Sequence, residues 1–93
     1  MRVRLHRKVR ADVDQIMDYY EDLAGPHLAD EFYKELLAFI RAAARRPERF
    51  HIVEQDLRRA NLRRFPYHFI YRVVGDYVRV LVVWACFDKT DKE

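Results

Sequence analysis

Two amphipathic segments that meet at Gly25–Pro26 constrain the fold of this chain more than any other feature. In residues 13–24, apolar side chains recur every three or four positions, which is the spacing of one face of an α-helix. Residues 28–43 repeat the pattern, and Pro47 disfavours helical geometry at the residue before it. Gly25 suits a helix C-terminal cap and Pro26 a helix start. The pattern therefore predicts two consecutive helices in a hairpin.

The remaining segments have the character of strands. Alternating apolar and charged residues predict a short strand over residues 3–9, whereas residues 47–57 lack clear periodicity and are interpreted as a loop. Three strands are then predicted, Arg58 to Phe65, Tyr67 to Val74 and Tyr77 to Phe87, with a two-residue turn at Gly75–Asp76. The last strand is apolar on both faces, which is typical of a central strand covered on both sides.

This order of elements predicts an α+β fold. An N-terminal strand, a helical hairpin and three antiparallel strands would place both helices on one face of a small four-stranded sheet. The length of 93 residues supports one domain over residues 1–93, and the scarcity of glycine (2) and proline (3) argues against disorder. The other face of the sheet would remain for charged residues and a ligand.

Charge is distributed unevenly along the chain, although the net charge is only +3. Residues 11–35 contain eight acidic residues and one basic residue, whereas residues 36–79 contain ten arginines and four acidic residues. Two interpretations stay open on composition: the two regions contact different partners, or the charges only solvate opposite faces.

The number and spacing of the cysteine and histidine residues indicate the cellular compartment and whether a metal site is expected. Cys86 is the single cysteine, so the chain cannot form an internal disulfide, which suits a reducing cytoplasm. The N-terminus lacks a long apolar stretch and the longest apolar run, residues 80–87, is too short to span a membrane, so a cytoplasmic protein without a membrane partner is expected. No cofactor or metal is expected, because the histidines lack metal-ligand spacing. These histidines are His6, His27, His51 and His68.

Arginines are dense on the predicted strands. Period-2 alternation places Arg59, Asn61 and Arg63 on one face of their strand and Arg58 and Arg64 on the other. An anion-binding surface is the functional interpretation, and pairing with the acidic helices of the same molecule is the structural alternative. Arg72 and Arg79 could extend these arginines into a basic band across neighbouring strands. The positive charges of this band are too dense for nearby acidic residues to neutralise completely, which favours a surface that binds a macromolecule. The candidate binding residues are Arg58, Arg59, Asn61, Arg63, Arg64, Arg72 and Arg79.

Aromatic residues and the thiol are given structural interpretations. Several strand aromatics suggest base stacking, but aromatic side chains are common in strands and cores. Cys86 ends an apolar strand with no histidine at a recognisable spacing, so a buried, inert thiol is expected. The aromatic residues concerned are Tyr67, Phe69, Tyr71, Tyr77 and Trp84.

An ordered set of segments resembles the RelE/ParE superfamily of toxins. Residues 58–71 resemble its arginine-rich strand and the turn Phe65-Pro66-Tyr67, and residues 72–78 and 80–83 continue that pattern. Residues 11–20 and 28–32 resemble parts of its two helices, and Pro47 matches the proline that follows them. The resemblance implies a growth-inhibiting, plasmid-stabilising type II toxin held in a hetero-oligomer by a cognate antitoxin protein.

The resemblance implies one of two activities. RelE-like members are ribosome-dependent mRNA endoribonucleases, whereas ParE-like members bind and inhibit DNA gyrase. Many members end the last strand with a histidine and, three residues on, an arginine; here Ala85 and Asp88 occupy those positions. This departure favours the ParE-like branch and a chain that is not an enzyme, with the metal-independent nuclease as the alternative.

Metal-free RNA cleavage needs a base, an acid and a cation that stabilises the phosphorane. Arginine serves only the last role well, because it stays protonated. If the chain were a nuclease, the candidates would be Arg59, Arg63 and His68. For His68, a partly exposed structural residue is the favoured interpretation, and alternation alone leaves open which set of residues on its strand faces the core.

Overall fold

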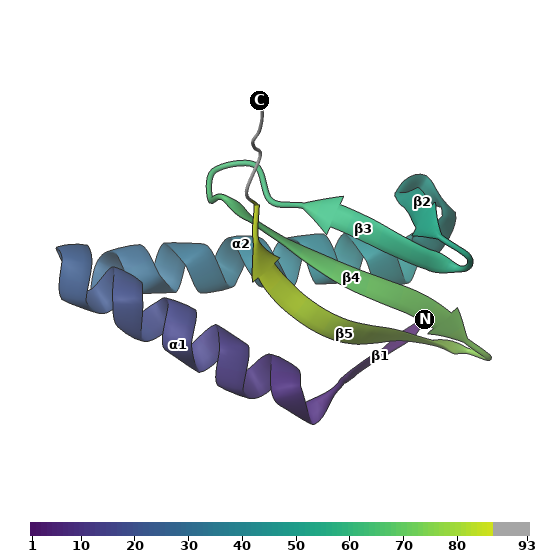
Figure 1. Ribbon diagram of the computed structural model, residues 1–93, viewed down its shortest axis with the longest axis horizontal. Helices are drawn as coiled ribbons and strands as arrows, with labels where there is room; N and C mark the ends of the chain where they lie inside the picture. Colours follow the sequence, from purple (N-terminus) through teal and green to yellow (C-terminus); the bar gives the residue numbers. More distant parts are fainter. Residues whose placement is uncertain (87–93) are drawn as a thin grey trace.

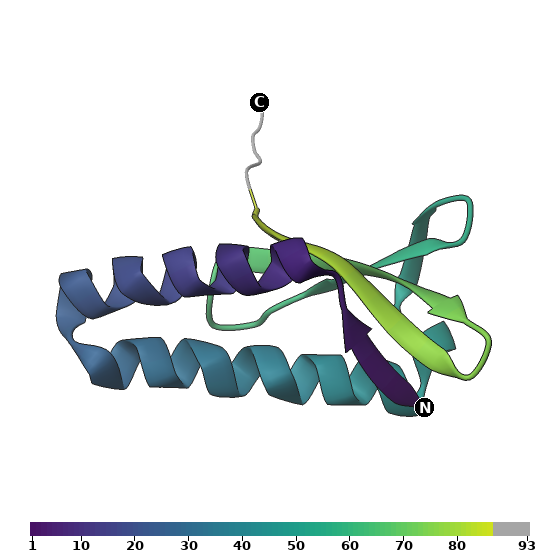
Figure 2. The same cartoon turned by 90° about the horizontal axis from the view of Figure 1, so that it is seen from below.

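A helical hairpin forms one layer of the molecule, as the sequence pattern predicts. The computed structural model describes residues 1–86, in which helix α1 (Arg7–Ala24) and helix α2 (Pro26–Arg45) run antiparallel (Figures 1 and 2). Gly25 joins them with φ of 93°, a left-handed conformation that glycine adopts without strain. The closed end of the hairpin extends beyond the strands (Figure 1). Buried apolar residues of both helices belong to the same hydrophobic cluster as those of the sheet.

The N-terminal strand is shorter than predicted. Strand β1 spans Arg2–Leu5, and residues 7–9 belong to α1 instead. His6 ends the strand because its Nδ1 accepts a hydrogen bond from the backbone N–H of Lys8 at 3.1 Å, which caps the helix. The alternation of apolar and charged residues continues past His6 in the sequence, and for this reason the predicted strand was too long.

Within residues 1–86, the sheet has five strands rather than the predicted four. Its order is β1-β5-β4-β3-β2, with β1 parallel to β5 and the other pairs antiparallel. The strand that sequence analysis missed, β2, lies in the predicted loop after a single 3-10 turn, η1. The α+β class with helices on one face is confirmed. The remaining bounds are η1 (Pro47–Arg49), β2 (His51–Glu54), β3 (Leu57–Asn61), β4 (Tyr67–Val74) and β5 (Tyr77–Ala85).

Strand ends and turns define the register. β4 matches its predicted bounds, and Gly75 opens the β4–β5 turn with φ of 59°. β3 ends at Asn61, four residues before the predicted end at Phe65. β5 ends at Ala85, so Cys86, which was predicted within that strand, lies outside it. Phe87, the predicted last strand residue, lies outside the described residues. The pairing of β4 with β5 shifts between Ile70 and Tyr71, where a bulge places one additional residue in β5.

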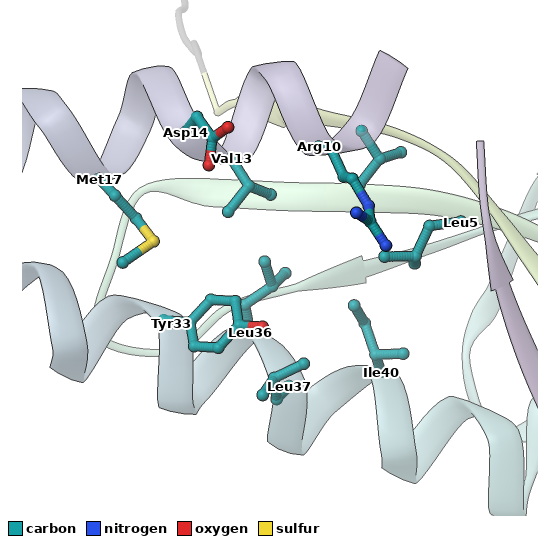
Figure 3. A pocket seen from close by; sticks show the side chains of 10 residues that line it. Leu5, Arg10, Val13, Asp14, Met17, Tyr33, Leu36, Leu37 and Ile40 are labelled. Carbon is teal, nitrogen blue, oxygen red and sulfur yellow. The ribbon is translucent and has the colours of Figure 1, made fainter. Parts of the chain in front are cut away.

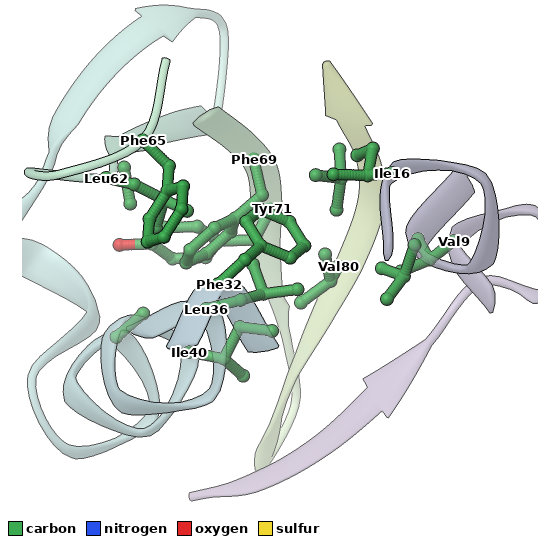
Figure 4. Close-up of a cluster of buried hydrophobic side chains, with 14 of the residues drawn as sticks. Val9, Ile16, Phe32, Leu36, Ile40, Leu62, Phe65, Phe69, Tyr71 and Val80 are labelled. Atoms are coloured by element: carbon green, nitrogen blue, oxygen red, sulfur yellow. The ribbon is translucent and has the colours of Figure 1, made fainter. Parts of the chain in front are cut away.

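The hydrophobic core lies between the helices and one face of the sheet (Figure 4). Phe69 and Tyr71 on β4 are fully buried there, as are Val78 and Val80 on β5. On α2, Phe32 is fully buried and lies with its ring centroid 5.5 Å from those of Phe65 and Tyr67. Alternate residues of the same strands must therefore point away from the helices.

A hydrogen bond at Met1 connects strand β1 to the helical layer. The Met1 ammonium donates to the carbonyl of Ala44 at 3.2 Å, which ties the start of β1 to the end of α2. Among residues 1–86, no helix combines the length and the apolar character that a membrane crossing requires.

Candidate binding surface

The face of the sheet that points away from α1 and α2, here called the outer face, carries four of the seven candidate residues. Cross-strand pairing places Arg59 opposite Ile70 and Asn61 opposite His68. Arg72 lies opposite Arg79 on the same face. Because directly paired residues share a face, the register brings these side chains to one surface that no helix of the described chain covers.

Three arginines form a continuous row across three strands. Arg4 on β1 pairs in register with Arg79 on β5, and Arg79 pairs with Arg72 on β4. We call Arg4, Arg79 and Arg72 the basic row. Like charges directly opposite each other destabilise a sheet, so the row carries an electrostatic cost within the fold. Arg4 is not among the candidates predicted from the sequence, because its place beside Arg79 depends on the parallel pairing of β1 with β5.

The three members of the row are compensated to different degrees. Arg72 donates from Nε and Nη2 to the two carboxylate oxygens of Asp56, at 3.2 and 2.8 Å. The Arg4 guanidinium lies 5.0 Å from the centroid of the Tyr77 ring, a cation–π contact. Arg79 is exposed, and within residues 1–86 no carboxylate oxygen pairs with its guanidinium. The centre of the row is therefore its least compensated charge.

The Arg72–Asp56 pair also affects titration. Hydrogen bonds and charge from Arg72 hold the pKa of Asp56 below its usual range. Asp56 therefore stays ionised at neutral pH and neutralises one end of the row. It lies in the β2–β3 turn, next to Gln55, whose φ is 54°.

An apolar region lies beside the basic row. Ile70 and Val82 pair opposite each other and are half-buried. Beyond them Trp84 pairs with His68, and the tryptophan residue is 54% exposed. We call Ile70, Val82 and Trp84 the apolar strip. The structure therefore places Trp84 on the surface, although Phe69 and Tyr71 occupy the core as the structural interpretation predicted. Strand β5 lies inside the sheet, between β1 and β4, as predicted for a central strand. The prediction that it is covered, or nearly covered, on both faces is wrong, because Arg79 and Trp84 are exposed on its outer face.

His68 lies at the edge of this strip and contacts Cys86. Its Nδ1 is 3.3 Å from the Cys86 Sγ, and its ring meets that of Trp84 edge-on at 6.3 Å. Burial, and secondarily the charge of Arg59, lowers the pKa of His68. The imidazole is therefore neutral at pH 7. Sequence spacing did not reveal the histidine near Cys86, and the thiol is half-buried rather than buried.

The other three candidate arginines lie away from the outer face. Arg58 shares the helix side with Tyr71, and its guanidinium donates to the carbonyl of Phe50 at 2.6 Å. Arg63 and Arg64 follow β3 in a loop, where the Glu35 Oε2 accepts their backbone N–H groups at 2.7 and 2.8 Å. The Arg64 side chain also pairs with Glu31 of α2. The structural alternative given for the arginines, pairing with acidic residues of the helices in the same molecule, therefore holds for Arg64.

The nuclease candidates are only partly brought together. Arg59 and His68 lie on the outer face, on adjacent strands, whereas Arg63 lies in the loop bound to Glu35. Ala85 supplies a methyl group where a histidine was considered, and Asp88 lies outside the described residues. Within residues 1–86, no three histidine, cysteine or carboxylate side chains are arranged to hold a metal ion.

A concave region lies on the helical layer, away from the outer face of the sheet. An open furrow of about 460 Å³ separates α1 from α2 (Figure 3). Val13 and Met17 face Tyr33 and Leu37 across it, and Arg10 lies toward one end. Its lining is mainly apolar, so it can exclude water from an apolar side chain but offers little acid–base chemistry.

Comparison with known proteins agrees with this architecture. The family described as ParE toxin of type II toxin-antitoxin system, parDE, matches residues 3–85. The chain belongs to the ParE toxin family. Among solved structures, a chain of the chromosomal ParDE TA system from P. aeruginosa is similar, with a TM-score of 0.83 and 23% identity. The match covers 94% of this chain and 97% of that one, and it shows a shared fold. A search of curated proteins found no significant match.

Family membership confirms the resemblance seen in the sequence and its ParE-like branch. The outer face therefore carries four of the predicted candidate residues together with Arg4 and the apolar strip, neither of which was predicted as part of the site. The binding role of all seven candidate residues stays a prediction.

Proposed function

We propose that this ParE-family chain is the toxin of a type II pair, that it binds and inhibits a macromolecular target such as DNA gyrase, and that a cognate antitoxin neutralises it. The observation that carries the proposal is the uncovered outer face with Arg79 at the centre of the basic row. A fold that maintains adjacent like charges is expected to offset that cost when an anionic partner binds.

The chemistry of the outer face supports inhibition by contact. Arginine stays protonated and can bind or stabilise negative charge, but it does not transfer protons at neutral pH. His68 is neutral and could accept a proton, but cleavage also needs an acid for the leaving oxygen. Ala85 occupies the position at which many members of the superfamily have a histidine, and its methyl group cannot transfer a proton. Inhibition by contact does not need such a proton-transferring group, whereas RNA cleavage does.

One observation favours the RelE-like alternative. A neutral imidazole and a guanidinium lie on adjacent strands at His68 and Arg59. These residues could act as base and phosphorane-stabilising cation in a ribosome-dependent mRNA endoribonuclease. This alternative predicts that His68→Gln abolishes toxicity while the fold and the antitoxin complex persist.

The test is induced expression in a bacterial host. We expect growth arrest with loss of DNA supercoiling and intact mRNA, and inhibition of purified gyrase by the purified chain. Arg79→Glu and Arg59→Glu should weaken the effect, whereas Arg41→Glu, an exposed change on α2, should not. Rapid mRNA loss with unchanged supercoiling would instead establish the nuclease.

The antitoxin is tested separately. We expect the product of an adjacent short reading frame to co-purify with the chain and to suppress its toxicity. A toxic chain that no neighbouring product suppresses would contradict this part of the proposal.

A further inference from the structure

The furrow between α1 and α2 exposes apolar side chains on the helical layer. Tyr33 is 42% exposed there, and Met17 and Leu37 are half-buried beside it (Figure 3). Toward the closed end of the hairpin, at Gly25, the furrow continues into a second hollow that Met17 also lines. An apolar surface that stays uncovered along much of a helical hairpin is typical of a surface that contacts another protein.

Charged side chains follow the rim of the furrow in a definite order. Arg10 lies toward the open end of the hairpin, and Arg7, one helical turn earlier, is exposed on the same side of α1. The carboxylates that follow toward the closed end are those of Asp14, Asp18 and Glu21 on α1 and Asp30 on α2. The furrow is therefore apolar in its middle, basic toward one end and acidic toward the other.

The fold leaves these rim charges without opposite charges. Within residues 1–86, no ion pair involves Arg10, Asp18 or Glu21. In contrast, the carboxylates of Glu31 and Glu35, on another side of α2, pair with Arg64. The rim thus keeps separated positive and negative charges that a complementary surface would neutralise.

A second copy of the same chain supplies such a complementary surface. Two hairpins can pack face to face about a two-fold axis in two ways. An axis parallel to the helices would bring the two acidic ends together, which like charges disfavour. An axis across the helices places α1 antiparallel to α1 of the second copy, so that the acidic half of each furrow covers the basic half of the other. Charge therefore selects the antiparallel arrangement.

The spacing of charges along α1 agrees with this arrangement. Positions 10 and 21 are about 16 Å apart along a helix, and their midpoint lies between Asp14 and Met17. A two-fold axis at this midpoint places Arg10 of each copy opposite Glu21 of the other. It also brings Met17 and Tyr33 of both copies together at the centre of the interface, because these two side chains face each other across the furrow (Figure 3).

The size of the hairpin predicts a reversible dimer. Helices of 18 and 20 residues are about 27–30 Å long, and two of them side by side give a footprint of roughly 500 Å² per copy. The total of about 1,000 Å² is at the lower limit for a specific interface. We therefore expect a dissociation constant on the order of 10 μM.

We infer that this chain forms a homodimer through the furrow, with α1 antiparallel to α1 of the second copy and with Arg10 opposite Glu21 at both ends. The furrow lies on the helical layer, so both outer faces stay uncovered in the dimer. The dimer would present the basic row twice, which permits bivalent contact with a target that has two sites. The inference does not depend on the proposed function, because self-association is measured on the chain alone.

Sedimentation velocity of the purified chain tests self-association. Over concentrations from about tenfold below to tenfold above the expected dissociation constant, the chain should change from monomer to dimer. Tyr33→Glu places a charge at the centre of the interface and should keep the chain monomeric. A wild-type chain that is monomeric at the highest concentration would overturn the inference.

Two charge reversals test the antiparallel arrangement. Arg10→Glu and Glu21→Arg each place like charges opposite each other at both ends, and each should raise the dissociation constant about tenfold or more. In an equimolar mixture of the two variants, both ends of the mixed dimer again join a positive and a negative side chain. The mixture should therefore dimerise within about threefold of the wild-type dissociation constant. Asp22→Arg is the matched control for Glu21→Arg, because Asp22 is exposed and does not line the furrow.

The remaining outcomes are distinct. Circular dichroism and denaturant unfolding should show that every variant is folded. Folded variants whose mixture stays monomeric would overturn the antiparallel arrangement, and a dimer that persists in Tyr33→Glu and in both charge reversals would place the interface elsewhere. A monomeric chain whose complex with the adjacent reading frame's product is lost in Tyr33→Glu would assign the furrow to that partner and overturn the inference. A dimer without toxicity would support the interface and count only against the proposed function.

Discussion

The two faces of strands β4 and β5 are built from alternate residues of the same segments, yet they serve different ends. The inner face carries Phe69, Tyr71 and Val80, all fully buried against the helices. The outer face carries the basic row and Trp84, with more than half of the tryptophan exposed. Period-2 geometry thus separates stability from binding at intervals of one residue, and substitutions on the two faces should have different consequences.

The largest expected effect is on the inner face. Phe69→Ala removes a fully buried ring, and we expect the free energy of unfolding to fall by about 3–5 kcal/mol. Trp84→Ala, on the next strand and the outer face, should lower it by less than about 1 kcal/mol. Denaturant unfolding of both variants measures the contrast. Similar losses from the two substitutions would mean that the outer face is part of the core.

Tyr71 extends the comparison to a buried polar group. Its hydroxyl donates to the carbonyl of Pro47 at 2.6 Å, so Tyr71→Phe should lower the free energy of unfolding by about 1–2 kcal/mol near neutral pH. Burial raises the pKa of Tyr71 to about 12, and that of Tyr20 similarly. Because the folded-state pKa is raised, the protonated form stabilises the fold fully below pH 10, and this contribution is lost as pH rises through about 12.

Unfolding measured from neutral pH to about pH 12 checks this sign. The wild-type chain should lose stability over that range, and Tyr71→Phe should lose less, with Tyr20 accounting for the remainder. A wild-type chain equally stable at the two ends of the range would contradict the assigned shifts.

Substitution of Glu35 tests whether its hydrogen bonds to the backbone of Arg63 and Arg64 stabilise the fold. Its Oε2 accepts the N–H groups of Arg63 and Arg64, and its side chain is 11% exposed. Glu35→Ala leaves both donors without their acceptor, so we expect a loss of about 1–2 kcal/mol and faster hydrogen exchange at these two amides. Glu31→Ala is the matched control, because Glu31 contacts side chains of Arg64 and His27. Equal exchange in the two variants would remove Glu35 from this role.

The elements predicted well from the sequence are those with strong periodicity. The hairpin about Gly25–Pro26 and the strand Tyr67 to Val74 have patterns that burial against one layer requires. β2 was missed because its four residues are all exposed and its pairing with β3 shifts between Ile52 and Glu54. Such a strand has no buried face, and therefore no alternation to detect.

The binding surface was predictable in part for the same reason. Alternation places Arg59 and Asn61 together, and the structure places Arg72 and Arg79 opposite each other on the same face of the sheet. Arg63 was placed with them because the strand was expected to continue to Phe65. Its end at Asn61 coincides with the Glu35 contact, which joins residues 28 positions apart. Arg4 required the parallel register of β1, which depends on tertiary structure.

The smallest expected effect, that of Asp56→Asn, tests whether the outer face is organised for binding rather than for stability. Both members of the Asp56–Arg72 pair are substantially exposed, at 59% and 39%, so its removal should change the free energy of unfolding little. The same substitution removes the charge that neutralises Arg72. Inhibition of purified gyrase, the proposed target, should therefore become about two- to threefold more potent. Asp76→Asn is the control, because Asp76 pairs with Arg2 outside the basic row. Marked destabilisation by Asp56→Asn, or weaker inhibition of gyrase, would mean that the pair serves the fold and that the two faces are less separate than alternation implies.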